Sequence, residues 1–164
     1  MANDVIDEVL GLSQGSDLFR LREQRAELKH RTQTSYQAAL RPSDPRNLSN
    51  AMRAALAARM ARLWNSRELA EHYDQLLGQE APDGVESAIS DPKLRPEGLT
   101  ARLEAIIRHV DLVTLRPKDA TRADIERLYA AGLDDRDIVT LANLIALVNY
   151  QILVTAGLRM LRDN

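Results

Sequence analysis

Residues 132–161, GLDDRDIVTLANLIALVNYQILVTAGLRML, decide the fold class. Asp134 is a favourable N-cap, because its carboxylate can accept hydrogen bonds from the free amides of a first helical turn. Asp135 and Asp137 add negative charge at the positive end of the helix dipole. From Ile138 to Ala156 no residue is charged. The stretch therefore predicts one long helix.

This helix carries apolar residues on most of its sides. One face combines apolar residues with a single amide: Ile138, Leu141, Ala142, Ile145, Asn149, Ile152 and Ala156. The opposite face mixes Leu144, Leu147 and Val154 with Thr140, Asn143 and Gln151. A helix of this kind must be covered on most sides, and its three amides disfavour a membrane span. We expect the central helix of an all-α domain, with one side available for a subunit contact.

The remaining segments also show helical spacing of apolar residues and no strand-like alternation. The expected helices are 4–11, 16–40, 49–64, 65–77, one turn at 85–89, 99–116 and 121–131. Asn65 with Glu68, and Thr121 with Asp124, have the spacing of capping boxes. The expected inner stripe of the 16–40 helix is Leu18, Leu21, Leu28, Thr32 and Tyr36. We predict a single domain over 1–164, with 1–47 as an N-terminal helical extension.

Composition narrows the function classes. The net charge of −2 disfavours strong binding to nucleic acid or to an anionic membrane. The chain has no cysteine, which excludes disulfides, thiolate nucleophiles and cysteine-ligated metals. Its first residues lack the basic segment of a signal peptide, so we expect a cytoplasmic protein.

Residues 112–158 resemble the C-terminal half of the alkylhydroperoxidase-D-like or carboxymuconolactone-decarboxylase-like superfamily, and most of all its peroxidase-related branch. The features that carry the resemblance are Pro117, Thr121, Asp124, the turn at 131–138, Val148-Asn149-Tyr150 and Gly157-Leu158. None of them is a catalytic motif. The resemblance implies an alkylhydroperoxidase-D-like helical bundle that assembles as a homo-oligomer, either a dimer or a ring of dimers.

Redox-active members of that superfamily carry a Cys-x-x-Cys pair followed by a histidine. Residues 48–73 resemble this segment in length and placement. In that register Ser66 and Leu69 occupy the cysteine positions, and Tyr73 occupies the histidine position, one residue after His72. The redox-active members also carry a glutamate one helix earlier, and in this register its position falls near Arg53 or Ala54. No thiol is present to ionise and attack a peroxide, so the family's peroxidase cycle is not expected.

The candidate pocket residues are Ser66, His72, Tyr73 and Asn149. His72 borders an apolar helix face, where an imidazole either titrates or simply packs at the edge. Asn149 lies on an apolar face and must bond to another helix, to water or to a ligand. Ser66 lacks an aspartate–histidine arrangement and is expected to cap a helix. The three histidines have no metal-like spacing, so neither a metal nor another cofactor is expected.

Two functions from different classes remain. The first is a cysteine-free relative of the alkylhydroperoxidase-D-like peroxidases that binds a small organic ligand, or serves as an assembly partner in an antioxidant-type system. The alternative is a thiol-independent acid/base enzyme of the carboxymuconolactone-decarboxylase type, which would use His72, Tyr73 or Glu71. Residues 121–146 also have helix–turn–helix spacing. However, the acidic start of the second helix would repel phosphates, which disfavours DNA binding.

Overall fold

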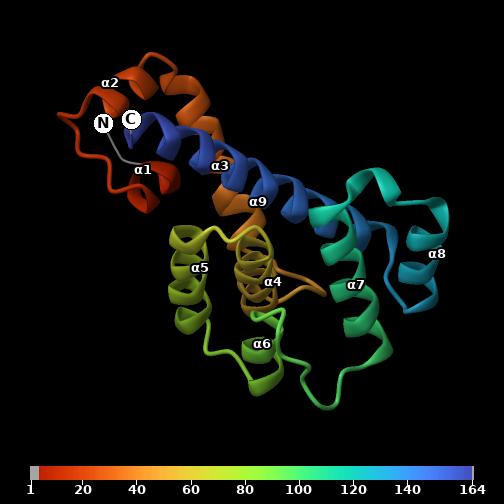
Figure 1. The fold of residues 1–164 in the computed structure, drawn as a ribbon. Helices are drawn as coiled ribbons and strands as arrows, with labels where there is room; N and C mark the ends of the chain where they lie inside the picture. Colours follow the sequence, from red (N-terminus) through yellow and green to blue (C-terminus); the bar gives the residue numbers. More distant parts are fainter. Residues whose placement is uncertain (1–3, 164) are drawn as a thin grey trace.

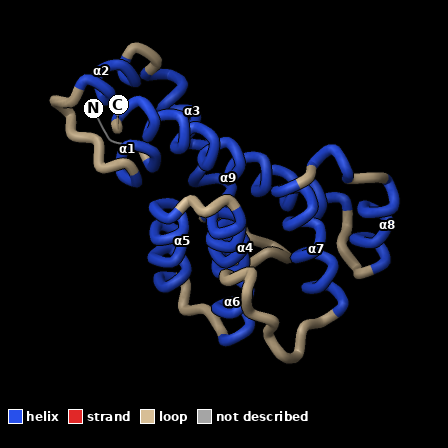
Figure 2. The backbone as a smooth tube through the Cα atoms, viewed as in Figure 1, coloured by secondary structure: helices blue, strands red, loops and turns tan. Residues whose placement is uncertain are grey.

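The computed structural model describes residues 4–163, and all regular secondary structure in this part of the chain is helical (Figure 2). The elements are α1 (Val5–Val9), α2 (Asp17–Glu23), α3 (Ala26–Leu40), α4 (Asn50–Leu63), α5 (Arg67–Gln79), α6 (Gly84–Ile89), α7 (Ala101–Leu115), the 3₁₀ turn η1 (Pro117–Asp119), α8 (Arg122–Ala130) and α9 (Asp135–Arg162). The expected all-α fold class is confirmed.

The long C-terminal helix organises the molecule. Its 28 residues correspond to a length of about 42 Å at 1.5 Å per residue. The expected Asp134 cap forms a capping box with Asp137, and Gly132 ends the preceding segment with a φ of +86°, a conformation that glycine adopts without strain. In Figure 1, α1 to α3 gather near the C-terminal half of α9, while α7 and α8 lie near its start.

Helix α4 is the second central element. Its residues 51–61 are all buried, and its alanines allow α5 to pack closely beside it. Ser49 caps it by accepting a hydrogen bond from the Met52 amide. From its far side, Arg59 donates to the Asp111 carboxylate on α7 at 2.7 Å and to the Ile89 carbonyl of α6 at 3.2 Å. These bonds hold α6 and α7 against α4.

The predicted single helix at 16–40 is wrong in one respect, because the chain breaks between α2 and α3 at Gln24 and Arg25. The predicted inner stripe is only partly correct. Thr32 and Tyr36 are buried as expected, but Leu21 and Leu28 are 50% and 52% exposed. The buried residues of α3 are Lys29, Thr32, Tyr36 and Leu40. Lys29 is drawn inward by acidic partners that local sequence periodicity does not reveal.

The expected capping box of Asn65 with Glu68 does not form. Asn65 adopts a left-handed φ of +53° directly after α4, a conformation that asparagine tolerates better than most residues. The N-cap position of α5 falls on Ser66, whose side chain makes no capping bond. Glu68 instead pairs with Arg159 of α9 at 3.2 Å. The Thr121–Asp124 capping box is present as predicted.

By length and composition alone, α9 could also cross a membrane. Of its most hydrophobic stretch, 44% is buried inside the protein, against α3, α4 and α7. The core helix of a globular protein meets the same criteria, so the composition of α9 does not by itself indicate a membrane span.

Candidate functional site

Two of the predicted site residues belong to packed contacts between helices. The hydroxyl of Tyr36 on α3 lies 2.8 Å from Nε2 of His72 on α5. The next residue, Tyr73, is fully buried, and its hydroxyl donates a hydrogen bond to Oε1 of Gln151 on α9. Burial lowers the pKa of His72, raises the pKa of Tyr36 to about 12, and raises the pKa of Tyr73 well above its usual value. All three side chains are therefore uncharged at neutral pH.

The other two predicted residues have different surroundings. Ser66 is buried at the start of α5 and lines a cavity of 420 Å³ together with Arg62 and Asp74. Asn149 is half-buried, and its amide makes no hydrogen bond to any residue in 4–163. Of the three partners considered for the Asn149 side chain, a neighbouring helix within residues 4–163 is therefore not the one found, and water or a ligand stays a prediction. The fully buried amide of α9 belongs to Gln151, two residues later.

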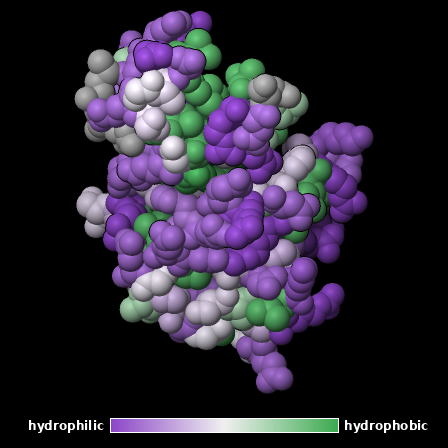
Figure 3. Space-filling model, turned by 60° about the vertical axis from the view of Figure 1, so that its left-hand side comes forward, coloured by the Kyte–Doolittle hydropathy of each residue, from purple (hydrophilic) through white to green (hydrophobic). Residues whose placement is uncertain are grey.

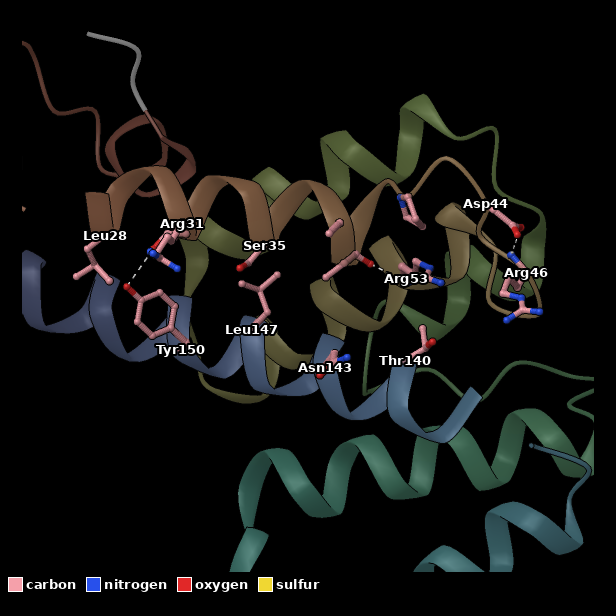
Figure 4. Close-up of a pocket in the computed structure, with 14 residues that line it drawn as sticks. Leu28, Arg31, Ser35, Asp44, Arg46, Arg53, Thr140, Asn143, Leu147 and Tyr150 are labelled. Carbon is pink, nitrogen blue, oxygen red and sulfur yellow. Dashed lines mark hydrogen bonds between the residues drawn. The ribbon is translucent and has the colours of Figure 1, made fainter. Parts of the chain in front are cut away.

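A larger groove lies elsewhere, between α3, the connection from α3 to α4, and α9 (Figure 4). Its volume is 620 Å³, within the range of about 300–1,000 Å³ that is usual for small-molecule sites. None of the four predicted pocket residues lines it. Its wall on α9 runs from Thr140 to Tyr150, a distance of about 15 Å along the helix.

One end of the groove combines apolar surface with one cation. Leu28 and the ring of Tyr150 lie there beside Arg31, and Leu147 lies nearer the middle of the groove, as Figure 4 shows. The hydroxyl of Tyr150 is 3.2 Å from Oγ1 of Thr32, and this bond joins α9 to α3. The ring is therefore held in place as part of the wall.

The other end is polar and positively charged. The Arg53 side chain is 5% exposed and donates to the carbonyls of Leu48 (2.9 Å), Ala39 (2.9 Å) and Pro45 (3.1 Å). Burial lowers the pKa of Arg53. Among residues 4–163 it has no carboxylate within salt-bridge distance. A buried guanidinium without a counter-ion thus borders an open groove.

Arg46 and Asp44 complete this end (Figure 4). The Arg46 amide donates to the Asp44 carboxylate at 3.1 Å, and Arg46 has a left-handed φ of +53°. No ion pair of the Arg46 side chain occurs in the described part of the chain. The charged residues lining the groove are three arginines and one aspartate, and the third arginine, Arg31, pairs with Glu27 at 2.6 Å.

The sequence did not indicate this groove. Its walls come from three segments that are far apart in the chain, and Arg53 lies within a helix that is otherwise buried. The position of Arg53 inside an Ala- and Met-rich buried helix was the one available signal, because a buried arginine needs acceptors. Within residues 4–163, no cluster of three or more His, Asp or Glu side chains is arranged to hold a metal ion.

Comparison with known proteins identifies the fold. No protein-family model matches the sequence, and no curated protein matches it. The crystal structure of an uncharacterized peroxidase-related protein from Silicibacter sp. TM1040 superimposes with a TM-score of 0.70 at 20% sequence identity. The match covers 80% of this chain and 68% of that chain. The chain therefore has a peroxidase-related, all-α fold.

Proposed function

We propose that the protein is a cysteine-free relative of the alkylhydroperoxidase-D-like peroxidases, and that it binds a small organic ligand without thiol peroxidase turnover. The groove between α3 and α9 is the observation that carries the proposal. It is lined by apolar side chains, including Leu28, Leu147 and the ring of Tyr150, together with polar and charged ones that can orient a ligand.

The residues at the family-like catalytic positions support a binding role over a redox role. Ser66 stands at the first cysteine position, and Leu69 at the second is fully buried. Neither side chain can form a thiolate or a disulfide, and both are required for a thiol peroxidase cycle.

The acid/base alternative has weaker support. His72 is bonded to Tyr36, and Tyr73 is fully buried against Gln151. The remaining candidate, Glu71, is exposed on the surface and pairs with Arg67 at 2.7 Å. A general acid or base must reach the substrate proton within hydrogen-bond distance, and these three side chains do not face one common cavity.

We expect the purified protein to consume an organic hydroperoxide, in the presence of a dithiol reductant, no faster than buffer does. A compound screen by ¹H–¹⁵N correlation spectra tests the binding half of the proposal. We expect the first compounds that bind to shift the amides of Thr140, Asn143 and Leu147. Peroxide turnover above background, or a screen whose binders all leave the groove amides unshifted, would overturn the proposal.

We also propose that the protein self-associates through the outer face of α9, as a dimer or a ring of dimers. Val139, Leu153 and Met160 are more than half exposed along this face. In Figure 3, hydrophobic residues gather in the upper part of the molecule, where α2 and the end of α9 lie. The helix begins with acidic residues and ends with Arg159 and Arg162. An antiparallel pair of α9 helices would therefore place unlike charges opposite each other.

For this assembly we expect light scattering at micromolar concentration to give at least twice the 18.4 kDa chain mass. Leu153→Glu should shift the protein to the single-chain mass, because a charge would enter the apolar contact. Glu126→Leu serves as the control. It replaces a charged side chain by an apolar one at an exposed position of α8, away from α9, and should leave the mass unchanged. A wild-type protein of 18.4 kDa would contradict the proposed assembly.

A further inference from the structure

The charge of Arg53 is the starting point for a more specific assignment. A guanidinium has five N–H donors. Three of those of Arg53 donate to backbone carbonyls, and the other two, one on each Nη, have no acceptor within residues 4–163. Carbonyl oxygens satisfy hydrogen bonds but carry no full negative charge. A buried cation is ordinarily paired with an anion, and no residue in 4–163 supplies one.

Arg46 adds a second cation at the same end of the groove. Its left-handed backbone is unusual for a residue with a long side chain, and its side chain takes part in no ion pair within residues 4–163. Asp44 is the one acid that lines this end, and it accepts from the Arg46 amide. Within the lining of this groove the two guanidinium groups outnumber the single carboxylate, which favours an anion there. Arg46 also lines a smaller neighbouring cavity with Asp134 and Asp137.

The residues at the opposite end of the groove determine the shape of a ligand that would fit. Leu28, Leu147 and the Tyr150 ring offer apolar surface, and Tyr150 already has its hydroxyl bonded to Thr32. Figure 4 shows Leu28 and Tyr150 at one end, beside Arg31, and Arg53 and Arg46 toward the other, with Ser35 and Leu147 between them. The charge of Arg31 is already paired with Glu27. A ligand that matches both ends has one charged head and an apolar body.

We infer that the groove binds an amphipathic organic carboxylate, with its head at Arg46 and Arg53 and its apolar body directed toward Leu28 and Tyr150. This inference rests on the proposed ligand-binding function and names the chemical class of the ligand. Arginine suits the role, because its planar fork matches a carboxylate in a bidentate geometry.

Octanoate and its neutral analogue octan-1-ol are suitable probes, since they differ in the head group. Titration is followed in ¹H–¹⁵N correlation spectra, which also report whether each variant is folded. We expect octanoate to shift the amides of Thr140, Asn143 and Leu147, and to bind at least about fivefold more tightly than octan-1-ol, as a charge-assisted hydrogen bond implies.

Arg46→Asn is the test variant, because asparagine removes the cation and tolerates the left-handed backbone. We expect it to weaken octanoate binding about five- to tenfold and to leave octan-1-ol binding unchanged. Arg122→Asn is the matched control, because it removes one charge from a side chain that is 93% exposed on α8. It should change octanoate affinity less than about twofold, since exposed charges are screened.

The outcomes separate the two levels of the proposal. If octanoate and octan-1-ol bind the groove equally well, or if Arg46→Asn has no more effect than Arg122→Asn, the carboxylate assignment is wrong and the ligand-binding function stands. If neither probe shifts the groove amides, the carboxylate assignment is also wrong, and the compound screen decides the ligand-binding function independently.

Discussion

Asp7→Ala should lower the free energy of unfolding by about 3–5 kcal/mol, the range for removing one partner of a buried ion pair. The Asp7 side chain is 0% exposed and contacts both Arg22 and Lys29. Burial acts to lower the pKa of Lys29, but the nearby carboxylates of Asp7 and Glu23 overcome this effect and raise it. Without Asp7, two buried cations would lose a shared counter-ion. Urea denaturation at constant m-value measures the change.

Asp17→Ala is the matched control for this prediction. It is the same substitution in the neighbouring helix, but Asp17 is 96% exposed, and its one ion pair within residues 4–163 is with the exposed Arg20. Surface pairs contribute little, so the expected change is within about 0.5 kcal/mol. Equal effects of the two substitutions would show that the ion pairs of Asp7 with Arg22 and Lys29 do not stabilise the fold. If Asp7→Ala instead produces a separate unfolding transition at lower urea and leaves the main midpoint unchanged, these ion pairs stabilise α1 to α3 alone.

Local sequence signals were sufficient for the fold class. The caps at Thr121 and Asp134 depend on residues three positions apart, and both form as expected. The helical turn expected at 85–89 is present as α6. Caps and short helical turns depend on residues within one or two helical turns of each other. They can therefore be predicted without knowledge of the tertiary structure.

Features that depend on distant contacts were not predictable in the same way. The break between α2 and α3 allows Lys29 to face Asp7 of α1, and the partner of Glu68 is Arg159, 91 residues away. The groove likewise requires α3, α9 and the connection before α4 to meet. Spacing along one helix cannot identify these partners.

The buried amide of α9 is the clearest example. The apolar pattern placed Asn149 on the more apolar face of the helix and Gln151 on the opposite face. In the structure the buried side is set by the packing of α3, α4 and α7, and it includes Leu144, Val148 and Gln151. Because α9 is apolar nearly all round, its composition does not determine which side faces the core.

Tyr73→Phe should therefore lower the free energy of unfolding by about 1–3 kcal/mol, the penalty for a buried polar group that loses its partner. The substitution keeps the ring and removes the hydroxyl that donates to Gln151 Oε1. Gln151 Nε2 already lacks a hydrogen-bond partner in the described part of the chain. The whole Gln151 amide would then be buried and unsatisfied. Urea denaturation of the variant at constant m-value measures the loss.

A double-mutant cycle with Gln151→Leu tests whether this bond joins α5 to α9. Gln151→Leu alone leaves the Tyr73 hydroxyl unpaired, while Tyr73→Phe/Gln151→Leu removes both polar partners. The double variant should be more stable than the sum of the single changes predicts, with a coupling of about 0.5–3 kcal/mol. Asn149→Leu is the control on the same helix, and its effect should stay within about 0.5 kcal/mol, because Asn149 is half-buried and its amide bonds to no residue in 4–163. Strict additivity would mean that the Tyr73 and Gln151 side chains stabilise the protein independently, and that their hydrogen bond does not hold the two helices together.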